Sequence, residues 1–253
     1  MKTKLTKLVY EEFAGKNAQE CYIKKAKEGL WISEKHFFKK YFVNKKSKLL
    51  DIGCGTGRTT IPLFKEGFGI LGIDFVPEMI KNAKLIAKQK KLKIKYEVGD
   101  ATSLKFKDNS FDYALFSNQG WTQIPGNANR FKALLEIKRV LKPKGKFIFT
   151  AHPRVVTGTY GWFWVKQWLK FHFGTLWGFK LDELDYGDRF FERETNDSQK
   201  TYMTKQYIHI PSIREVIFEI RKAGFKLIEY NGDLQISKKD VRTHPPVFFV
   251  CEK

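Results

Sequence analysis

A short glycine-rich segment is the first part of this chain whose residue types could bind a ligand. Gly53, Gly55 and Gly57 follow a run of apolar residues and precede a predicted helix. Glycines at such a point allow a tight turn and let a ligand approach the backbone at a helix N-terminus. The dinucleotide-binding fingerprint requires a glycine at its sixth position, where this chain has Arg58. The spacing therefore disfavours a nicotinamide dinucleotide as the ligand.

Three aspartates end or follow three successive predicted strands. Asp51 precedes the glycines, where its carboxylate would repel a pyrophosphate and suits an ammonium group or another cation. Asp74, 21 residues after Gly53, can accept hydrogen bonds from both hydroxyls of a ribose. Asp100, followed by Ala101, stands where a carboxylate can bind the exocyclic amino group of an adenine. Each aspartate alone also fits a helix cap or a turn, but together they indicate one crevice at the carboxyl edge of a sheet.

The elements that must position these residues alternate between strand and helix. Buried apolar runs predict strands, and helical periodicity bounded by glycine or proline predicts helices. The expected strands are 48–52, 68–73, 94–98, 111–116, 146–150, 225–230 and 247–251. The expected helices are two or three segments within 5–43, then 58–66, 77–90, 127–141 and 212–223. This alternation predicts an α/β fold with a doubly wound, mostly parallel sheet.

Four segments of the chain resemble the class I S-adenosylmethionine-dependent methyltransferases. They are LLDIGCGTG (49–57), GIDFVPEMI (72–80), GDATSLKFKDNSFDYALFS (99–117) and LLEIKRVLKPKGKFIF (134–149). The resemblance implies a Rossmann-like, seven-stranded sheet whose last strand, 247–251, runs antiparallel. It also implies S-adenosyl-L-methionine as the cofactor and S-adenosyl-L-homocysteine as the product. No metal is expected, because the histidines have no metal-ligand spacing.

The resemblance assigns the cofactor contacts residue by residue. The expected contacts are Asp51 with the amino group, Gly53, Cys54, Gly55, Gly57 and Ser117 with the methionine part, Asp74 with the ribose, and Phe75, Val76, Asp100 and Ala101 with the adenine. The protein of such an enzyme mainly aligns the acceptor with the methyl group, because a sulfonium is already a good leaving group. A general base is therefore not required.

Residues that bind the methyl acceptor are expected after the fourth and fifth strands. Asn118, Gln119 and Trp121 could orient a polar substrate, and His152 could act as a general base with an ordinary pKa near 6.5. The alternative is that the first three residues form a turn anchored by the indole, and that His152 is a loop residue bonded to the backbone. This segment lacks the NPPY or DPPY signature of many amino-group methyltransferases of DNA and protein, which weakens those subfamilies.

The strand–helix alternation breaks over residues 152–210, which hold 14 of the 39 aromatic residues. This aromatic-rich insertion is expected to be a lid, with 155–205 packed over the carboxyl edge of the sheet, because its aromatics need cover and the reaction needs water excluded. A dimer contact, a membrane-surface helix and a base-stacking platform stay open, since Lys166 and Lys170 share one face of an apolar helix. The opposite wall is expected to come from N-terminal helices carrying Tyr10, Phe13, Tyr22 and Trp31.

Composition bounds the class of protein. A chain of 253 residues with 42% hydrophobic and 29% charged residues suits a single folded methyltransferase domain, and no apolar run reaches the roughly 18 residues of a membrane-spanning helix. Three distant cysteines fit a reducing compartment, so a cytoplasmic location is expected. We divide the domain into a helical cap (1–47), a cofactor-binding core (48–151), the insertion (152–210) and a C-terminal helix with strands (211–253).

The charge of the chain leaves two classes of acceptor open. The formal net charge is +20, and the basic excess is concentrated in the first 150 residues. It indicates either attraction to a polyanion such as RNA or a surface filled with exposed lysines. We expect a methyltransferase acting on a small molecule, because the insertion is nearly neutral and aromatic. The alternatives are a tRNA or rRNA methyltransferase and, in another class, a non-catalytic binding module that retains the cofactor fold; a homodimer also stays open.

Overall fold

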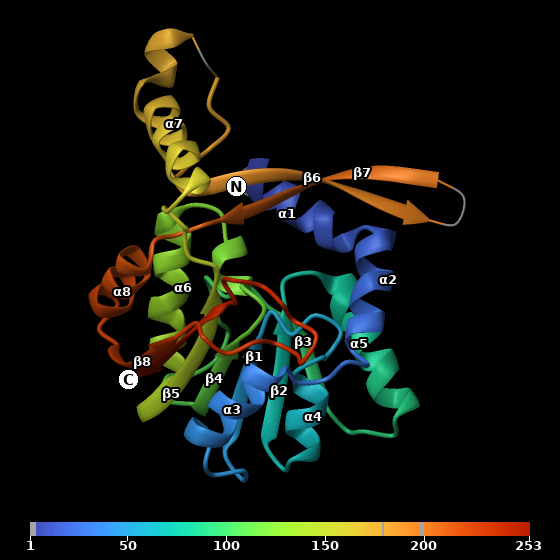
Figure 1. The fold of residues 1–253 in the computed structure, drawn as a ribbon. Coiled ribbons are helices and arrows are strands. Elements are labelled where there is room, and N and C mark those ends of the chain that lie inside the picture. The colour runs from blue at the N-terminus through green and yellow to red at the C-terminus, as the bar shows by residue number, and fades with distance from the viewer. Residues whose placement is uncertain (1–3, 179, 198–199) are drawn as a thin grey trace.

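A seven-stranded sheet forms the centre of the computed structural model, which describes residues 4–178, 180–197 and 200–253 (Figure 1). The strand order is β3-β2-β1-β4-β5-β9-β8. The strands from β3 to β5 are parallel, whereas β9 runs antiparallel between β5 and β8. Their bounds are β1 Lys48–Ile52, β2 Gly69–Asp74, β3 Lys95–Val98, β4 Phe111–Phe116, β5 Leu141–Ala151, β8 Lys226–Asn231 and β9 Val247–Glu252. The predicted doubly wound sheet with an antiparallel last strand is confirmed.

Helices cover both faces of this sheet. They are α1 Lys4–Ala14, α2 Lys16–Lys25, α3 Ile32–Tyr41, α4 Thr60–Lys65, α5 Pro77–Gln89, the short 3-10 helix η1 Gly120–Gln123, α6 Asn127–Val140 and α8 Ile213–Lys222. Each expected helix is present within about two residues of its predicted bounds. In the described parts of the chain, no helix has the length and apolarity needed to cross a bilayer.

Alternate residues of each strand enter two separate apolar layers, as the pleat requires. Leu50 and Phe149 pack in the layer that α6 and α8 cover, where Val140 and Ile220 are also buried. Leu49 and its neighbours pack in the opposite layer, which α3 closes with Phe37 and Phe38, and Phe42 follows directly after the helix. The two layers hold the sheet rigid, so the loops at its carboxyl edge have a fixed base.

Strand β5 begins five residues earlier than expected. Leu141 is fully buried and pairs with Phe111 of β4, after which the pairing shifts register before Tyr113 meets Lys146. The apolar side chain of Leu141 therefore extends the strand past Pro143 and Gly145, which the sequence suggested would lie outside it. Proline is tolerated here because it lies at the irregular end of the pairing.

The insertion contains the apolar helix that the sequence indicated around Lys166 and Lys170, and a hairpin that the sequence did not predict. Helix α7 (Thr159–Phe173) and the 3-10 helix η2 (Gly174–Trp177) are followed by a long hairpin of β6 (Asp188–Asp197) and β7 (Lys200–His209), which forms its own two-stranded sheet. The hairpin crosses the carboxyl edge of the main sheet and contacts α1 and η1 (Figure 1). Helix α7 instead projects away from the body of the molecule.

Candidate functional site

A cavity of about 370 Å³ lies at the carboxyl ends of β1, β2, β3 and β4. Its size is within the range of small-molecule sites. The expected cofactor residues that line it are Gly53, Gly55, Asp74, Phe75, Val76, Asp100, Ala101 and Ser117. Residues at the carboxyl ends of four strands, β1 to β4, therefore meet in one cavity, as the spacing of the motifs predicted.

The glycine loop can be built only from glycine at its critical points. Gly53 has φ +61°, and a Cβ there would lie 2.7 Å from Cε2 of the Phe116 ring. Gly57 has φ +96°, and a Cβ there would lie 2.5 Å from the Tyr96 hydroxyl. Gly53 and Gly55 expose backbone to the cavity, whereas Gly57 faces away from it and lets the chain enter α4. The loop thus presents bare backbone to a ligand.

Asp51 lies behind the glycine loop and does not line the cavity. It is 1% exposed, and its Oδ2 accepts hydrogen bonds from the hydroxyls of Thr59 and Thr60 at 2.7 and 2.6 Å. Within the described chain its Oδ1 has no hydrogen-bond partner, and burial raises the pKa of this carboxyl to about 6. Asp51 therefore fastens the loop to the start of α4. Its predicted contact with the cofactor amino group stays a prediction.

Cys54 is a second expected cofactor residue that lies outside the cavity lining. Its side chain is buried beside Tyr96 and Ala83, and its thiol donates a weak hydrogen bond to the Gly55 carbonyl at 3.6 Å. Burial raises the pKa of the thiol well above its usual value, so the sulfur stays protonated. Cys54 packs the underside of the loop.

The carboxylate of Asp74 lines the cavity and also holds the local backbone. Its Oδ2 accepts a hydrogen bond from the amide of Gly55 at 2.8 Å, and its Oδ1 accepts one from Val76 at 2.9 Å. Burial raises the pKa of Asp74 to about 6, although these backbone hydrogen bonds oppose the shift. Asp74 therefore ties the end of β2 to the glycine loop and keeps its oxygens at the cavity wall.

Asp100 occupies the corresponding place after β3. Its Oδ1 accepts hydrogen bonds from the amide and the hydroxyl of Thr102, both at 2.8 Å. These hydrogen bonds form the turn that the sequence analysis left open as an alternative role for Asp100. The same residue also lines the cavity. Ala101 beside it is 9% exposed and offers a small apolar wall.

A buried ion pair joins the glycine loop to the N-terminal helices. Arg58 makes two hydrogen bonds of 2.7 Å to the Glu34 carboxylate, and its guanidinium stacks 4.3 Å from the centre of the Trp31 ring. Arg58 also donates to the hydroxyl of Ser117 at 3.2 Å, and that hydroxyl donates to Glu34. The Arg58 side chain is 10% exposed and that of Glu34 is fully buried. This network fixes the loop, α3 and the end of β4 relative to one another.

The segment after β4 enters the site in an unusual backbone conformation. Asn118 and Gln119 have φ values of +49° and +60°, in the left-handed region that non-glycine residues seldom adopt. Asn118 lines the cavity, whereas Gln119 does not. The backbone N–H of Gln119 donates a hydrogen bond to the Thr150 hydroxyl at 2.8 Å. Such strain concentrates at functional sites, because only a rigid surrounding structure maintains it.

Like Gln119, the other two expected acceptor residues, Trp121 and His152, do not line the cavity. Trp121 is 1% exposed, packs against Phe149, and donates its indole N–H to the carbonyl of Arg130 at 3.0 Å, so it anchors the η1 turn in the core. His152 is partly buried near Arg242 and does not line the cavity. Burial and the nearby positive charge lower its pKa to about 4, below the ordinary value that we expected.

The wall opposite the glycine loop comes from α1 and α2. Phe13 and Tyr22 line the cavity, as predicted, together with Thr6 and Val9. Thr6, Val9 and Phe13 share one face of α1 at the i, i+3, i+7 spacing of a buried helical face. That spacing was a readable signal, although we did not assign Thr6 and Val9 to the site.

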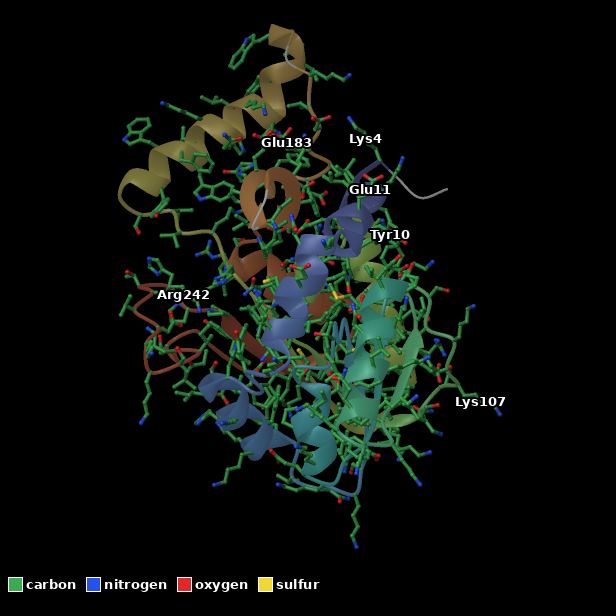
Figure 2. All side chains as sticks on the ribbon, turned by 90° about the vertical axis from the view of Figure 1, so that its right-hand side faces the viewer. Lys4, Tyr10, Glu11, Lys107, Glu183 and Arg242 are labelled. Carbon is green, nitrogen blue, oxygen red and sulfur yellow. The ribbon has the colours of Figure 1, made fainter. Side chains whose placement is uncertain are left out.

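Helix α1 is held over the cavity from both sides. Tyr10, labelled in Figure 2, packs edge-on against Phe75 with ring centres 6.0 Å apart. Its hydroxyl donates a hydrogen bond to the Glu78 carboxylate of α5 at 3.3 Å. From the outer side, the amide of Tyr207 in β7 donates to the Glu12 carboxylate at 3.3 Å. The hairpin of the insertion therefore supports the cover of the cavity from outside.

The prediction that residues 155–205 pack over the carboxyl edge holds for the β6–β7 hairpin, which crosses this edge on the outer side of α1, but not for α7, and a lid over the cavity is not confirmed. No described residue of 152–210 lines the cavity, and α7 points away from it. The physical reason is that α1 already fills the place over the carboxyl edge, so the hairpin can only pack on its outer side. Other lining residues that the sequence analysis missed include Gln123, Ile124, Pro125 and Asn129 at η1 and the start of α6.

The cavity suits S-adenosylmethionine on its own chemistry. Its only acidic side chains are Asp74 and Asp100, and among the described residues no lysine, arginine or histidine lines it. A cavity of that kind favours a cationic ligand with hydrogen-bond donors, such as a sulfonium that carries a ribose and an adenine. When bound, this cofactor supplies an electrophilic methyl group. Gly53, Gly55, Asp74, Phe75 and Asp100 would hold it.

Comparisons with known proteins agree with this site. Residues 50–149 match the family model described as a methyltransferase domain. The chain is 33% identical to the demethylmenaquinone methyltransferase of Lactobacillus johnsonii over 60% of this chain and 63% of that protein. It is 29% identical to the ubiquinone/menaquinone biosynthesis C-methyltransferase UbiE of Rickettsia felis over 80% and 77% of the two chains. The chain spans about half the length of the first three curated relatives, from 42% to 63%.

The fold has solved counterparts. A SAM-dependent methyltransferase from Methanosarcina mazei superimposes with a TM-score of 0.66 and 23% identity, over 86% of this chain and 96% of that chain. Residues 50–149 therefore match a methyltransferase domain, and the strand order of the whole sheet is that of the class I methyltransferase fold. S-adenosylmethionine is the cofactor that this domain match and fold imply.

Proposed function

We propose that this protein transfers a methyl group from S-adenosylmethionine to a small, uncharged and largely apolar acceptor of the quinone type. The observation that carries the proposal is the character of the cavity beyond its cofactor residues. That part is lined by Val9, Phe13, Ile124 and Pro125, together with uncharged polar side chains. The relatives from Lactobacillus johnsonii and Rickettsia felis, named as quinone methyltransferases, support the same class of acceptor.

The charge of the cavity argues against an anionic acceptor. The chain carries a net charge of +20, yet the described residues that line the cavity include two carboxylates and no cationic side chain. A phosphate or carboxylate brought to this site would be repelled and would find no ion pair. The amides of Asn118, Gln123 and Asn129 can instead donate hydrogen bonds to carbonyl or hydroxyl oxygens on an aromatic ring.

The chain contributes alignment and exclusion of water. No histidine, lysine or cysteine stands among the described lining residues to remove a proton, and burial raises the pKa of the Tyr22 phenol above its usual value. Rate enhancement then depends on holding an acceptor atom in line with the methyl group. Helix α1 closes that space, because its apolar face lies over it.

A transfer assay with radiolabelled S-adenosylmethionine tests this function. We expect label in a short-chain demethylated naphthoquinol and none in a mixed tRNA pool. Val9→Gln on the inner face of α1 should raise KM for the quinol several-fold and leave S-adenosylhomocysteine affinity unchanged, since Val9 lies at the acceptor wall. Lys7→Gln on the exposed side of the same helix is the matched control. Label in tRNA but not in the quinol would overturn the proposal.

A further inference from the structure

Helix α7 and η2 carry an unusual amount of exposed apolar surface. Of the twenty large hydrophobic side chains exposed in the described chain, nine lie between Tyr160 and Trp177. The most exposed of them are Leu176 at 79%, Trp162 at 73% and Trp177 at 59%. Contiguous surface of this kind, rather than scattered single residues, marks an interaction site.

The exposed side chains form a stripe along one side of the helix. Trp162, Val165, Leu169 and Phe173 follow the i, i+3, i+7, i+11 spacing, which places them within one apolar face. The exposed Leu176 and Trp177 follow in η2, and the Trp177 ring lies 6.2 Å from that of Phe173. The helix stands clear of the rest of the molecule, so nothing in the described chain covers the stripe (Figures 1 and 2).

The base of α7 is fastened firmly, so the exposed stripe has a fixed direction. Trp164, on the opposite side of the helix, is 6% exposed and lies under two guanidinium groups, those of Arg154 at 5.4 Å and Arg189 at 4.3 Å from its ring centre. The Tyr186 hydroxyl donates to the carbonyl of Trp164 at 2.8 Å. Lys170 pairs with Glu183 at 2.9 Å, and Figure 2 shows Glu183 near α7. The aromatic face is therefore held outward by the fold.

The charged side chains carried by α7 itself are basic, although Glu183 of the following segment pairs with one of them, Lys170. From residue 137 to residue 181 the chain has no aspartate or glutamate, whereas Arg154, Lys166, Lys170 and Lys180 lie near the stripe in sequence. Lys166 is exposed on α7 itself, and Lys180 follows η2. Tryptophans with flanking lysines on a helix that is too short to span a bilayer are the composition of an interfacial helix.

We propose that α7 and η2 dock on the surface of an anionic lipid bilayer, with the stripe from Trp162 to Trp177 entering the headgroup region and the lysines contacting lipid phosphates. A second copy of this chain is the other candidate to cover the stripe. It is disfavoured because two chains that each carry +20 repel one another, whereas an anionic bilayer attracts both the helix and the basic body. The proposal stands apart from the choice of acceptor.

Vesicle co-sedimentation of the full chain tests the proposal. We expect the protein to sediment with vesicles of phosphatidylcholine and phosphatidylglycerol at low salt, and binding to weaken both with added salt and with pure phosphatidylcholine. The variant Trp162→Ser/Leu169→Ser/Trp177→Ser should reduce the partition coefficient at least about 10-fold, because three apolar side chains no longer enter the interface. Lys166→Glu/Lys180→Glu should reduce it mainly at low salt.

The matched control removes exposed apolar side chains from other helices. Leu85→Ser/Leu135→Ser/Phe218→Ser, at positions 48%, 43% and 61% exposed, should bind vesicles like the wild type. S-adenosylhomocysteine affinity, measured in all variants, checks that the fold is intact. Equal binding of the α7 variant and the control variant, or no sedimentation of the wild type, would overturn the proposal. A concentration-dependent dimer in ultracentrifugation that only the α7 variant abolishes would also overturn it.

Discussion

Two groups of residues that line the cavity differ in their charge and polarity. At one end, loops from the strands β1, β2 and β3 supply bare glycine backbone and the carboxylates of Asp74 and Asp100. At the other end, α1 and the η1 region supply Val9, Phe13 and Ile124 with neutral amides. The first group of residues suits a cationic cofactor, and our proposal assigns the second group to an uncharged acceptor. The local charge of a cavity, rather than the +20 of the whole chain, is therefore the guide to its ligands.

The largest expected effect comes from breaking the ion pair that fixes the glycine loop to α3. Arg58→Met leaves the Glu34 carboxylate buried without its partner, which should cost about 3–5 kcal/mol in the free energy of unfolding. Urea denaturation measures the change. The control is Arg242→Met, which removes a partly exposed pair with Asp240 and should cost less than about 1 kcal/mol. Equal losses of unfolding free energy in the two variants would show that the buried Arg58–Glu34 pair does not stabilise the contact between the glycine loop and α3.

A smaller loss of stability is expected from the glycine loop at the cofactor end. Gly53→Ala places a Cβ against Phe116 at a positive φ, which should cost roughly 2–4 kcal/mol from left-handed backbone strain and overpacking. Gly29→Ala is the matched control, because Gly29 has φ +70° but open space around it, and about 1–2 kcal/mol is expected from strain alone. Thermal unfolding of both variants separates packing from backbone strain. Indistinguishable melting temperatures would rule out the close approach of Phe116.

The cofactor end should respond to the loss of one carboxylate without loss of fold. Asp74→Asn should weaken S-adenosylhomocysteine binding by about 1–3 kcal/mol, because the ribose hydroxyls and the Gly55 amide lose a charged acceptor. Titration calorimetry measures the affinity, with the exposed Asp233→Asn as control. Unchanged affinity in Asp74→Asn would remove this carboxylate from the cofactor site.

The same carboxylate predicts how binding depends on pH. Burial raises the pKa of Asp74 to about 6, above its unfolded value, so the folded chain binds its proton more tightly. The contribution of this group to folding stability is therefore largest at low pH and falls as pH rises through the window up to about 6. Cofactor affinity should change in the opposite direction, because only the ionised form is a charged acceptor. Calorimetry should find weaker binding at pH 5 than at pH 7.5, and this slope should flatten in Asp74→Asn.

The smallest effect is expected at His152. Because its pKa is lowered to about 4 and its side chain does not line the cavity, His152→Ala should leave kcat and its pH profile nearly unchanged. Steady-state kinetics with the acceptor identified by the transfer assay measures this. A rate that loses its pH dependence in His152→Ala would return the imidazole to the reaction as a general base.

The sequence predicted which strand-end residues meet in the cavity, because their motifs are close in the chain and each motif directly follows a recognisable strand. Gly53, Asp74 and Asp100 each follow a strand whose apolar pattern is plain, and parallel strands bring such ends together. Asp51 and Cys54 belong to the same motif but lie outside the cavity lining, because Asp51 accepts hydrogen bonds from residues at the start of α4 and Cys54 packs in a small apolar cluster under the loop. A motif therefore locates a loop more reliably than it locates each side chain.

The acceptor end could not be predicted in the same way. Thr6 and Val9 reach the cavity only because α1 crosses the sheet edge, and that placement depends on contacts such as Glu12 with the distant Tyr207. The aromatic residues of the insertion suggested a buried lid, yet most of those in α7 are exposed. Aromatic content alone does not distinguish a core from an interaction surface.

Calorimetric titration of S-adenosylhomocysteine and NAD into the wild-type protein and the Asp74→Asn and Val9→Gln variants tests the division of the cavity most directly. We predict that S-adenosylhomocysteine binds the wild type and Val9→Gln alike, that it binds Asp74→Asn more weakly, and that NAD does not bind. Binding of NAD without S-adenosylhomocysteine, or an equal loss of S-adenosylhomocysteine affinity in both variants, would contradict a cavity with a cofactor end at Asp74 and an acceptor end at α1.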